Sequence, residues 1–277
     1  MKVAKLARAV AAAATATTTA AHPSAKLVGG VDAAIEQFPY QISLQYYFPY
    51  PSSDGFYGYR FPSHVCGGVI IRPDSVLTAA HCIIDDDDDK WDRDNFLVRA
   101  GSSSWSSGGQ LVKVAGITTH PSYDPKKRFA NDVAVLRLAH NLTLGATVAV
   151  ADLPGPRDEA PSAGADVVVA GWGHAYSMSM KSTTRLRSLA SRVVSWKECA
   201  IRYARSGGIG RDNLCAGDME GLKNARQGDS GGGLYHVARK KVVGIVSYGT
   251  LVPRRGYPTV FTDVSRLGGW IKKVSGA

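Results

Sequence analysis

The chain has 277 residues, of which 44% are hydrophobic and 20% are charged, and its formal net charge is +10. This is enough apolar material for one large core or two small ones, and no uninterrupted apolar run is long enough to span a bilayer. Residues 1–26 hold four basic residues and no acid, so the remainder carries 10 − 4 = +6. The other basic residues are scattered, and we expect neither a nucleic-acid nor a membrane partner.

Residues 1–26 are typical of a targeting and processing segment. Three basic residues precede an alanine-rich stretch from Ala9 to Ala21, which ends in the small residues that signal peptidase prefers. We therefore expect a signal peptide at 1–21, a short propeptide at 22–26 and a secreted, extracellular protein. The alternatives are a disordered tail or an organelle transit peptide.

Short apolar runs separated by turn residues predict a chain made largely of β-strands. The runs are rich in Val and Ile and are flanked by Gly, Pro or Ser. Only residues 264–274 place apolar side chains at helical spacing, which predicts a single helix at the C-terminus. The clearest strand candidates are 69–71, 96–98, 133–138, 166–170 and 242–246.

Three motifs carry a histidine, an aspartate and a serine in that order. They are Thr78-Ala79-Ala80-His81-Cys82, Asn131-Asp132-Val133 and Gly228-Asp229-Ser230-Gly231-Gly232. A serine hydroxyl is a weak nucleophile at neutral pH and needs a nearby base. A carboxylate placed before an apolar strand, as Asp132 is, needs a partner because its unpaired burial is costly. Alternatively, the last motif is a glycine-rich hairpin without a catalytic role.

These motifs resemble those of the chymotrypsin- and trypsin-like serine proteases. The resemblance runs from about Leu27 to the C-terminus, because Leu27-Val28-Gly29-Gly30, Val65-Cys66-Gly67-Gly68, Gly171-Trp172-Gly173 and Ser247-Tyr248-Gly249 also match in order. It implies an all-β peptidase domain at 27–277, with two six-stranded antiparallel barrels and the active site in the cleft between them. The first barrel is expected at about 27–150, the second at about 151–262 and the helix at about 263–275.

The resemblance also assigns roles. It implies a secreted serine endopeptidase in which His81 is the general base, Asp132 orients it and Ser230 is the nucleophile. The amides of Gly228 and Ser230 form the oxyanion hole.

Four cysteines allow three pairings, and the resemblance selects Cys66 with Cys82 and Cys199 with Cys215. Since no C-x-x-C spacing exists, we expect no metal site, and we expect no cofactor. The histidines outside the triad, such as His64, show no metal spacing and are interpreted as surface or hydrogen-bonding residues.

A zymogen is implied by the acid beside the serine. In the family, a new amino terminus pairs with this acid, which here is Asp229. Cleavage after Lys26 would release Leu27, where the family usually has a β-branched residue.

The substrate pocket departs from that of trypsin. Asn224 falls at the pocket floor, where trypsin-like enzymes carry an aspartate, and a buried cation there would lack its partner. Gly249 and Ser247 match wall positions. Thr259 replaces a glycine and should narrow the pocket, as in elastase-like relatives. We expect a preference for small or medium uncharged side chains, so cleavage after Lys26 requires another, tryptic protease.

Arg226 stands where the family usually has a disulfide-bonded cysteine. The loop at 250–256 lacks the partner cysteine as well. We interpret Arg226 as pointing to water. Turned inward, it would favour acidic substrates instead.

We assign no catalytic role to the remaining sequence features. The acidic run Asp85 to Lys90 resembles an enteropeptidase site but is read as a solvated insertion. Residues 100–120 contain no acid, so we expect no calcium there. Eight aromatic residues within 46–61 suggest an expanded hairpin, and Asn141 lies in a glycosylation sequon.

Two further functions stay open at this point. One is a protease-fold binding protein without catalysis, and the other is an esterase using the same site. For the enzyme we expect polypeptide substrates, an activating protease, proteinaceous inhibitors and a monomeric state.

Overall fold

The computed structural model describes residues 30–48, 50–51, 57–58, 61–84, 91–155, 158–173, 183–220, 224–250 and 254–277. The expected leader, the activation residues Lys26 and Leu27 and the acidic run Asp85 to Lys90 lie outside these residues. Short 3-10 helices are η1 (Ile35–Gln37), η2 (Ala80–Cys82), η3 (Arg93–Asn95), η4 (Pro125–Lys127) and η5 (Ala204–Ser206), and a small hairpin pairs β3 (Tyr50–Pro51) with β4 (Tyr57–Gly58).

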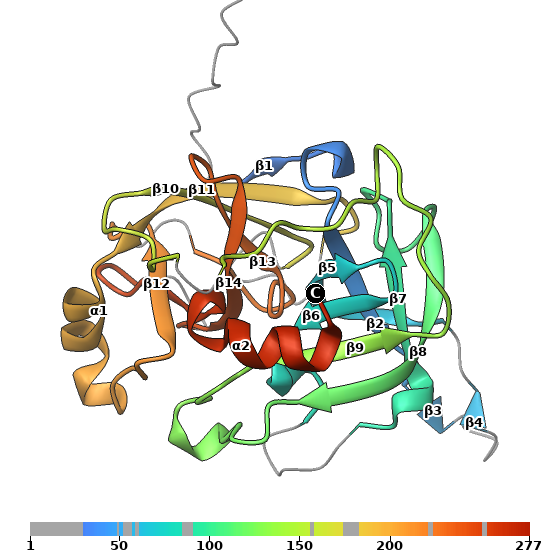
Figure 1. Cartoon of the computed structure of the whole chain (residues 1–277), viewed down its shortest axis with the longest axis horizontal. Coiled ribbons are helices and arrows are strands. Elements are labelled where there is room, and N and C mark those ends of the chain that lie inside the picture. The colour runs from blue at the N-terminus through green and yellow to red at the C-terminus, as the bar shows by residue number, and fades with distance from the viewer. Residues whose placement is uncertain are drawn as a thin grey trace, which may run out of the picture.

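Six antiparallel strands close into a first barrel, in the order β2-β5-β6-β9-β8-β7 (Figure 1). Closure pairs every strand on both sides and leaves no exposed sheet edge. The interior is filled by branched apolar side chains such as Ile42, Leu44 and Leu136, all fully buried. The strands are β2 (Gln41–Tyr46), β5 (Ser63–Arg72), β6 (Ser75–Thr78), β7 (Phe96–Ala100), β8 (Gln110–Thr119) and β9 (Ala134–Leu138).

The second barrel runs β11-β10-β13-β14-β15-β12 and closes through the β11–β12 pairing. The predicted pair of six-stranded antiparallel barrels is thereby confirmed. One strand joins it from the start of the chain, because β1 (Val31–Asp32) pairs with β11, with Val31 opposite Ser188. The other strands are β10 (Asp166–Gly171), β11 (Arg187–Val194), β12 (Asn213–Gly217), β13 (Gly233–His236), β14 (Lys241–Tyr248) and β15 (Thr259–Asp263).

The predicted C-terminal helix is confirmed as α2 (Val264–Ser275). Asp263 caps its N-terminus by accepting from the backbone N–H of Ser265, and Val264, Leu267 and Ile271 are buried in a core shared with the first barrel. A second helix, α1 (Trp196–Tyr203), was not expected. It is only eight residues long and buries just Cys199 and Tyr203, too few for a clear helical period.

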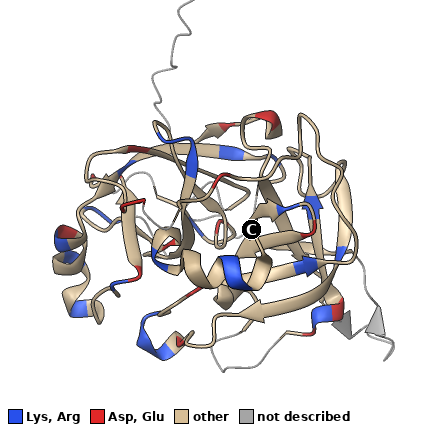
Figure 2. Ribbon diagram, in the orientation of Figure 1, with Lys and Arg blue, Asp and Glu red and all other residues tan. Residues whose placement is uncertain are grey.

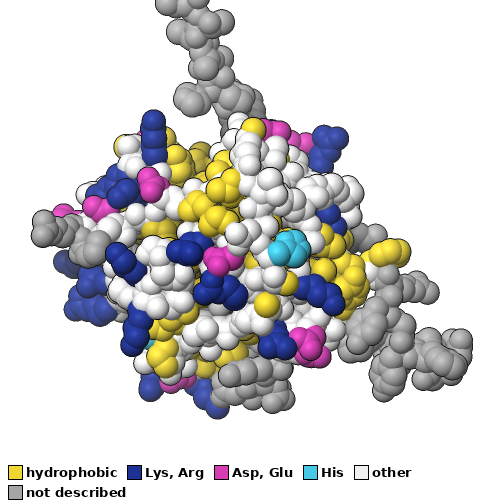
Figure 3. Space-filling view, turned by 45° about the vertical axis from the view of Figure 1, so that its right-hand side comes forward, with side chains coloured by type: hydrophobic (Ala, Val, Ile, Leu, Met, Phe, Trp, Pro, Cys, Tyr) yellow, Lys and Arg dark blue, Asp and Glu magenta, His cyan; other side chains and the backbone are white. Residues whose placement is uncertain are grey.

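Within the described residues, no helix is both long and apolar enough to cross a membrane. On the face drawn in Figure 3, basic side chains are dispersed among acidic and uncharged ones rather than gathered into one block. This arrangement agrees with the scattered charge of the sequence.

Two disulfides fasten short segments to the barrels. Cys66 of β5 is bonded to Cys82 of η2, and Cys199 of α1 to Cys215 of β12, with 16 residues of separation in both cases. They are the pairs that the resemblance implies. Because a disulfide stabilises mainly by limiting the unfolded chain, loops of equal length give similar contributions.

We therefore expect the double variants Cys66→Ala/Cys82→Ala and Cys199→Ala/Cys215→Ala to lose about 3 kcal/mol of unfolding free energy each. Urea unfolding of both variants, with the disulfide-bonded parent as reference, measures the two losses. A difference of more than about 2 kcal/mol between them would show that loop closure does not dominate either value.

Candidate active site

His81 and Asp132 are brought together by the pairing of two neighbouring strands. Thr78 at the end of β6 lies opposite Ala134 at the start of β9, so the residues just outside this pair meet. The imidazole Nδ1 of His81 lies 2.7 Å from Asp132 Oδ2, and the His81 backbone N–H donates to Oδ1 at 3.0 Å. One carboxylate therefore fixes both the ring and the backbone of the histidine.

The second barrel completes the surroundings of Asp132. Ser247 Oγ donates to its Oδ2 at 2.5 Å, and Thr262 Oγ1 donates to its backbone carbonyl at 2.8 Å. Asp132 is fully buried, whereas the His81 side chain is 20% exposed. Burial alone raises the pKa of Asp132, but the charge and hydrogen bonds of His81 and the Ser247 hydroxyl together hold that pKa below its ordinary value. The buried carboxylate is therefore ionised at neutral pH.

Ser230 lies on a tight turn between Gly228 and Gly231, whose φ angles are +94° and +78°. This turn abuts the histidine segment. A side chain at Gly231 would come within 2.2 Å of Thr78 Oγ1 and 2.5 Å of the Gly67 carbonyl. The Ser230 carbonyl in turn accepts from Gly67 N–H at 2.7 Å. Only glycine can hold the serine turn this close to the first barrel.

The backbone amides of the serine turn fall into two groups. Those of Asp229, Gly231 and Gly232 donate to backbone carbonyls at 2.8 to 3.0 Å. Those of Gly228 and Ser230 donate to no acceptor in the part of the chain that is described. Two free backbone donors beside the Ser230 hydroxyl are what an oxyanion site requires.

His64 holds the carbonyl side of Gly228 and was not anticipated as part of the site. Its Nε2 lies 2.8 Å from the Gly228 carbonyl oxygen, and its Nδ1 lies 2.8 Å from Ser43 Oγ. Because the carbonyl only accepts, Nε2 carries the proton and Nδ1 accepts from the hydroxyl. No sequence feature linked His64 to a glycine so far along the chain.

Asp229 points away from the serine into the second barrel. Its Oδ1 accepts from Gly173 N–H and its Oδ2 from Arg226 N–H, both at 2.9 Å. It borders a cavity of about 30 Å³ that is also lined by Gly30, three residues after Leu27. The first described residue of the chain therefore lines the same cavity as Asp229.

The expected pocket residues are close to one another. Asn224 donates from Nδ2 to the Tyr257 carbonyl at 3.0 Å. Thr259 faces Gly249, since a Cβ at Gly249 would lie 3.9 Å from Thr259 Oγ1. Asn224 Oδ1 and Thr259 Oγ1 are buried polar atoms without a hydrogen-bond partner among the described residues. Ser247, expected on the pocket wall, has its hydroxyl committed to Asp132.

The interpretation of Arg226 as pointing to water was wrong. Its Nε and Nη2 are buried and find no acceptor among the described residues. Burial lowers the pKa of this guanidinium, and the nearby charge of Asp229 partly opposes that shift. The carboxylate that attracts the side chain inward lies three residues away.

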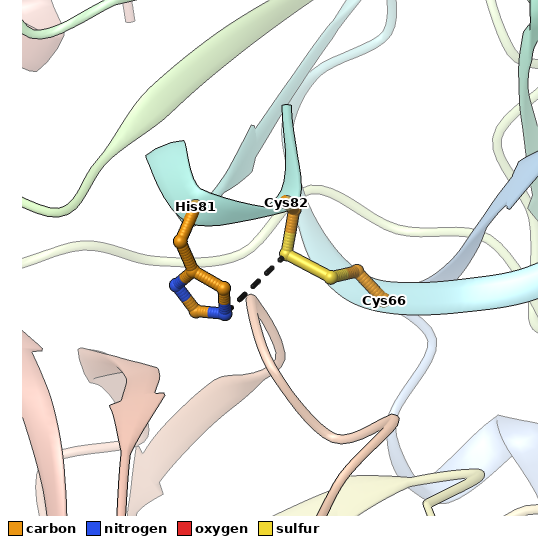
Figure 4. A group of neighbouring side chains, drawn as sticks. All are labelled: Cys66, His81 and Cys82. Atoms are coloured by element: carbon orange, nitrogen blue, oxygen red, sulfur yellow. Dashed lines mark hydrogen bonds between the residues drawn. A yellow bond between two sulfur atoms is a disulfide. The ribbon is translucent and has the colours of Figure 1, made fainter. Parts of the chain in front are cut away.

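A cluster of Cys66, His81 and Cys82 has the proximity of a metal site, with its ligand atoms within 4.8 Å of one another (Figure 4). Cys82 Sγ lies 4.0 Å from His81 Nε2. Both sulfurs are bonded to each other, so neither is a thiolate that can bind a metal. The cluster is a disulfide that packs against the histidine.

Known proteins are similar in sequence to this chain. The family described as Trypsin matches residues 27–271. Trypsin 5G1 of Aedes aegypti is 37% identical over 257 residues, which cover 93% of this chain and 88% of that protein. Hypodermin-B of Hypoderma lineatum is 38% identical over 247 residues, covering 89% and 86%. Trypsin of Sarcophaga bullata is 36% identical over 252 residues, covering 90% and 89%.

The Ser247 hydroxyl should stabilise the fold in a pH-dependent way. Ser247→Ala removes a hydrogen bond to a buried charge, so we expect a loss of about 1.5–3 kcal/mol in unfolding free energy at pH 7. A lowered carboxyl pKa stabilises the fold above the unfolded value of about 3.9, and this stability is lost as the pH falls through the folded value. The difference between variant and parent should therefore shrink below about pH 4.

Urea unfolding at pH 7 and at pH 3 measures this difference. Ser162→Ala, which removes an exposed hydroxyl near the start of β10, is the matched control. An equal loss at both pH values would contradict the assignment of the effect to the ionised carboxylate.

Proposed function

Since this chain belongs to the trypsin family and is a serine endopeptidase that acts on polypeptides, we propose that it cleaves peptide bonds through an acyl-enzyme formed on Ser230. The observation that carries this proposal is the pair of free amides at Gly228 and Ser230. They flank the hydroxyl on a turn that abuts the His81 segment, where Asp132 fixes the imidazole.

His81 moves the proton in both halves of the reaction. It accepts the proton of the Ser230 hydroxyl while the oxygen attacks the peptide carbonyl, and it then donates that proton to the leaving amine. Water then attacks the carbonyl carbon of the acyl-enzyme while His81 accepts its proton. His81 returns that proton to the Ser230 oxygen, and the acid product is released. Asp132 stays ionised, holds Nδ1–H and stabilises the imidazolium that forms.

The two free amides stabilise the negative charge on the carbonyl oxygen. Loss of one such donor typically lowers turnover about 10²–10³-fold. His64 supports this site by fixing the Gly228 peptide from its carbonyl side. A binding protein without catalysis has no need of this arrangement, so we favour the enzyme.

The chain is made as a secreted zymogen and acts outside the cell. The basic, alanine-rich leader supports secretion. Cleavage after Lys26 frees the amino group of Leu27, which enters the cavity beside Asp229. The position of Gly30 at that cavity supports this step.

The specificity pocket takes small or medium uncharged side chains. Asn224 brings no charge to the floor, and Thr259 narrows the space opposite Gly249. A lysine or arginine in such a pocket is buried without a partner. The enzyme is therefore activated by a different, tryptic protease, and we expect it to act as a monomer that proteinaceous inhibitors block.

A fluorophosphonate probe tests the nucleophile. Cleaved wild-type enzyme should be labelled, and Ser230→Ala should not. His81→Ala should lower kcat for a peptide by about 10⁴-fold or more, because the hydroxyl loses its base. His140→Ala, at an exposed histidine, is the matched control. Labelling of Ser230→Ala, or no labelling of the wild type before or after cleavage at Lys26, would overturn the assignment.

A peptide library tests the pocket. Asn224→Asp should raise kcat/KM for lysine and arginine substrates about 10²–10³-fold, because the buried cation gains a partner worth about 3–5 kcal/mol. Thr259→Gly should favour larger side chains. Asn141→Asp makes the same change at an exposed position and should leave the profile unchanged. Efficient tryptic cleavage by the wild type would contradict the proposed preference.

A further inference from the structure

The carboxylate of Asp229 is closely enclosed by the second barrel. Its two oxygens accept from the backbone N–H groups of Gly173 and Arg226, both at 2.9 Å. A Cβ at Gly171 would lie 2.2 Å from this carboxylate, and a Cβ at Gly173 would lie 2.5 Å from it. Because little water can reach a carboxylate in such surroundings, it needs a nearby positive charge to stay ionised.

The direction of the Asp229 side chain also controls the serine turn. Asp229 stands between Gly228 and Ser230, whose backbone amides are the proposed oxyanion donors. If the carboxylate turned out to water, it would carry the adjoining peptide groups with it. The position of both donors therefore depends on whatever holds Asp229 inside the barrel.

In the proposed activation, the amino group of Leu27 supplies this positive charge only after cleavage at Lys26. Before cleavage, the charge has to come from a side chain. Of the described residues that line the cavity of about 30 Å³ beside Asp229, only Arg187 and Arg226 are basic. The lining thus carries two positive charges and one negative charge.

Arg187 is already engaged elsewhere. Its Nη2 donates to the Gly30 carbonyl at 2.6 Å, and its Nε lies 3.7 Å from Asp32 Oδ1. Figure 2 shows basic residues on β11, which carries Arg187, beside β1, which carries Asp32. The side chain of Arg187 therefore fastens the start of the chain to β11, and Arg226 is left as the cation for Asp229.

Arg226 is held inward although no acceptor is bound to two of its nitrogens. Its Nε and Nη2 are buried and have no hydrogen-bond partner in the described part of the chain. An arginine with this freedom ordinarily extends into water. Burial lowers the pKa of the guanidinium, and the charge of Asp229 opposes that shift. The attraction of Asp229 is thus the interaction that favours the inward position.

The two charges face the same small cavity instead of touching. Among the ion pairs of the described residues, none joins the Arg226 guanidinium directly to Asp229, yet both side chains line this space. A cavity of about 30 Å³ can hold one or two water molecules, which can relay hydrogen bonds between the groups around them. Arg226 therefore supports Asp229 in two ways, through its backbone N–H and through its charge.

We propose that Arg226 is a resident counter-ion for Asp229, which positions the serine turn before the chain is cleaved at Lys26. The uncleaved chain therefore already has peptidase activity, and cleavage adds the Leu27 amino group to a site that holds a positive charge. Arg226 is a positioning residue, because it acts on the oxyanion donors through Asp229. The proposal rests on the proposed peptidase function.

An uncleavable precursor tests this proposal. Lys26→Gln removes the tryptic bond, and the rate of fluorophosphonate labelling reports whether the serine site has formed. The Lys26→Gln protein should be labelled at a rate within about 10²-fold of that of cleaved wild type. Adding Arg226→Gln should slow its labelling about 10–10²-fold, because a nearby opposite charge favours an ionised carboxylate by one or more powers of ten.

Cleaved proteins and matched variants separate the charge from other effects of the substitution. In wild type cleaved after Lys26, Arg226→Gln should slow labelling less than about threefold, since the Leu27 amino group then supplies the charge. In the uncleavable protein, Arg226→Lys should restore most of the rate, because it keeps the charge. Arg192→Gln removes an exposed arginine paired with Asp166, and this control should leave the rate of the uncleavable protein unchanged.

Three results would overturn the proposal while the proposed function stands. They are labelling of the Lys26→Gln protein more than about 10²-fold slower than that of cleaved wild type, an unchanged rate after Arg226→Gln, and equal losses in the cleaved and uncleaved proteins. Failure of the proposed function itself looks different, because cleaved wild type then takes up no label.

Discussion

A single buried carboxylate connects the two halves of this protein. Asp132 accepts from the ring and backbone of His81 in the first barrel and from Ser247 in the second. Its complete burial is tolerable only because each of these donors is present. The same contacts that keep the charge stable also align the histidine, so stability and chemistry depend on one set of hydrogen bonds.

The junction between the two barrels is built from reciprocal contacts rather than from either barrel alone. The serine turn of the second barrel reaches the first through Gly67, and the histidine segment of the first abuts that turn through Thr78. Glycines at 67 and 231 permit the approach, since side chains there would overlap backbone or hydroxyl atoms. Relative movement of the barrels would therefore disturb the proposed base and the proposed nucleophile together.

Local patterns predicted the β-strands, the C-terminal helix and the motifs of His81, Asp132 and Ser230, because periodicity and short motifs are properties of neighbouring residues. The two barrels were implied by the family resemblance that these motifs carry. What escaped prediction depends on residues far apart in the chain. His64 gains its role from Gly228, the Ser247 hydroxyl turns to Asp132, and Arg226 is drawn inward near Asp229. Helix α1 was missed because its sequence has no strong amphipathic pattern. A disulfide and two buried side chains hold it in place instead.

The pairing of β1 with β11 has a consequence for biosynthesis. Val31 emerges from the ribosome early, but its partner Ser188 belongs to the half of the chain that is made last. Domains generally fold as they are synthesised, from the N-terminus onward. Strand β1 therefore waits without its partner until the second barrel assembles, so it takes its place in the sheet only when folding is nearly finished.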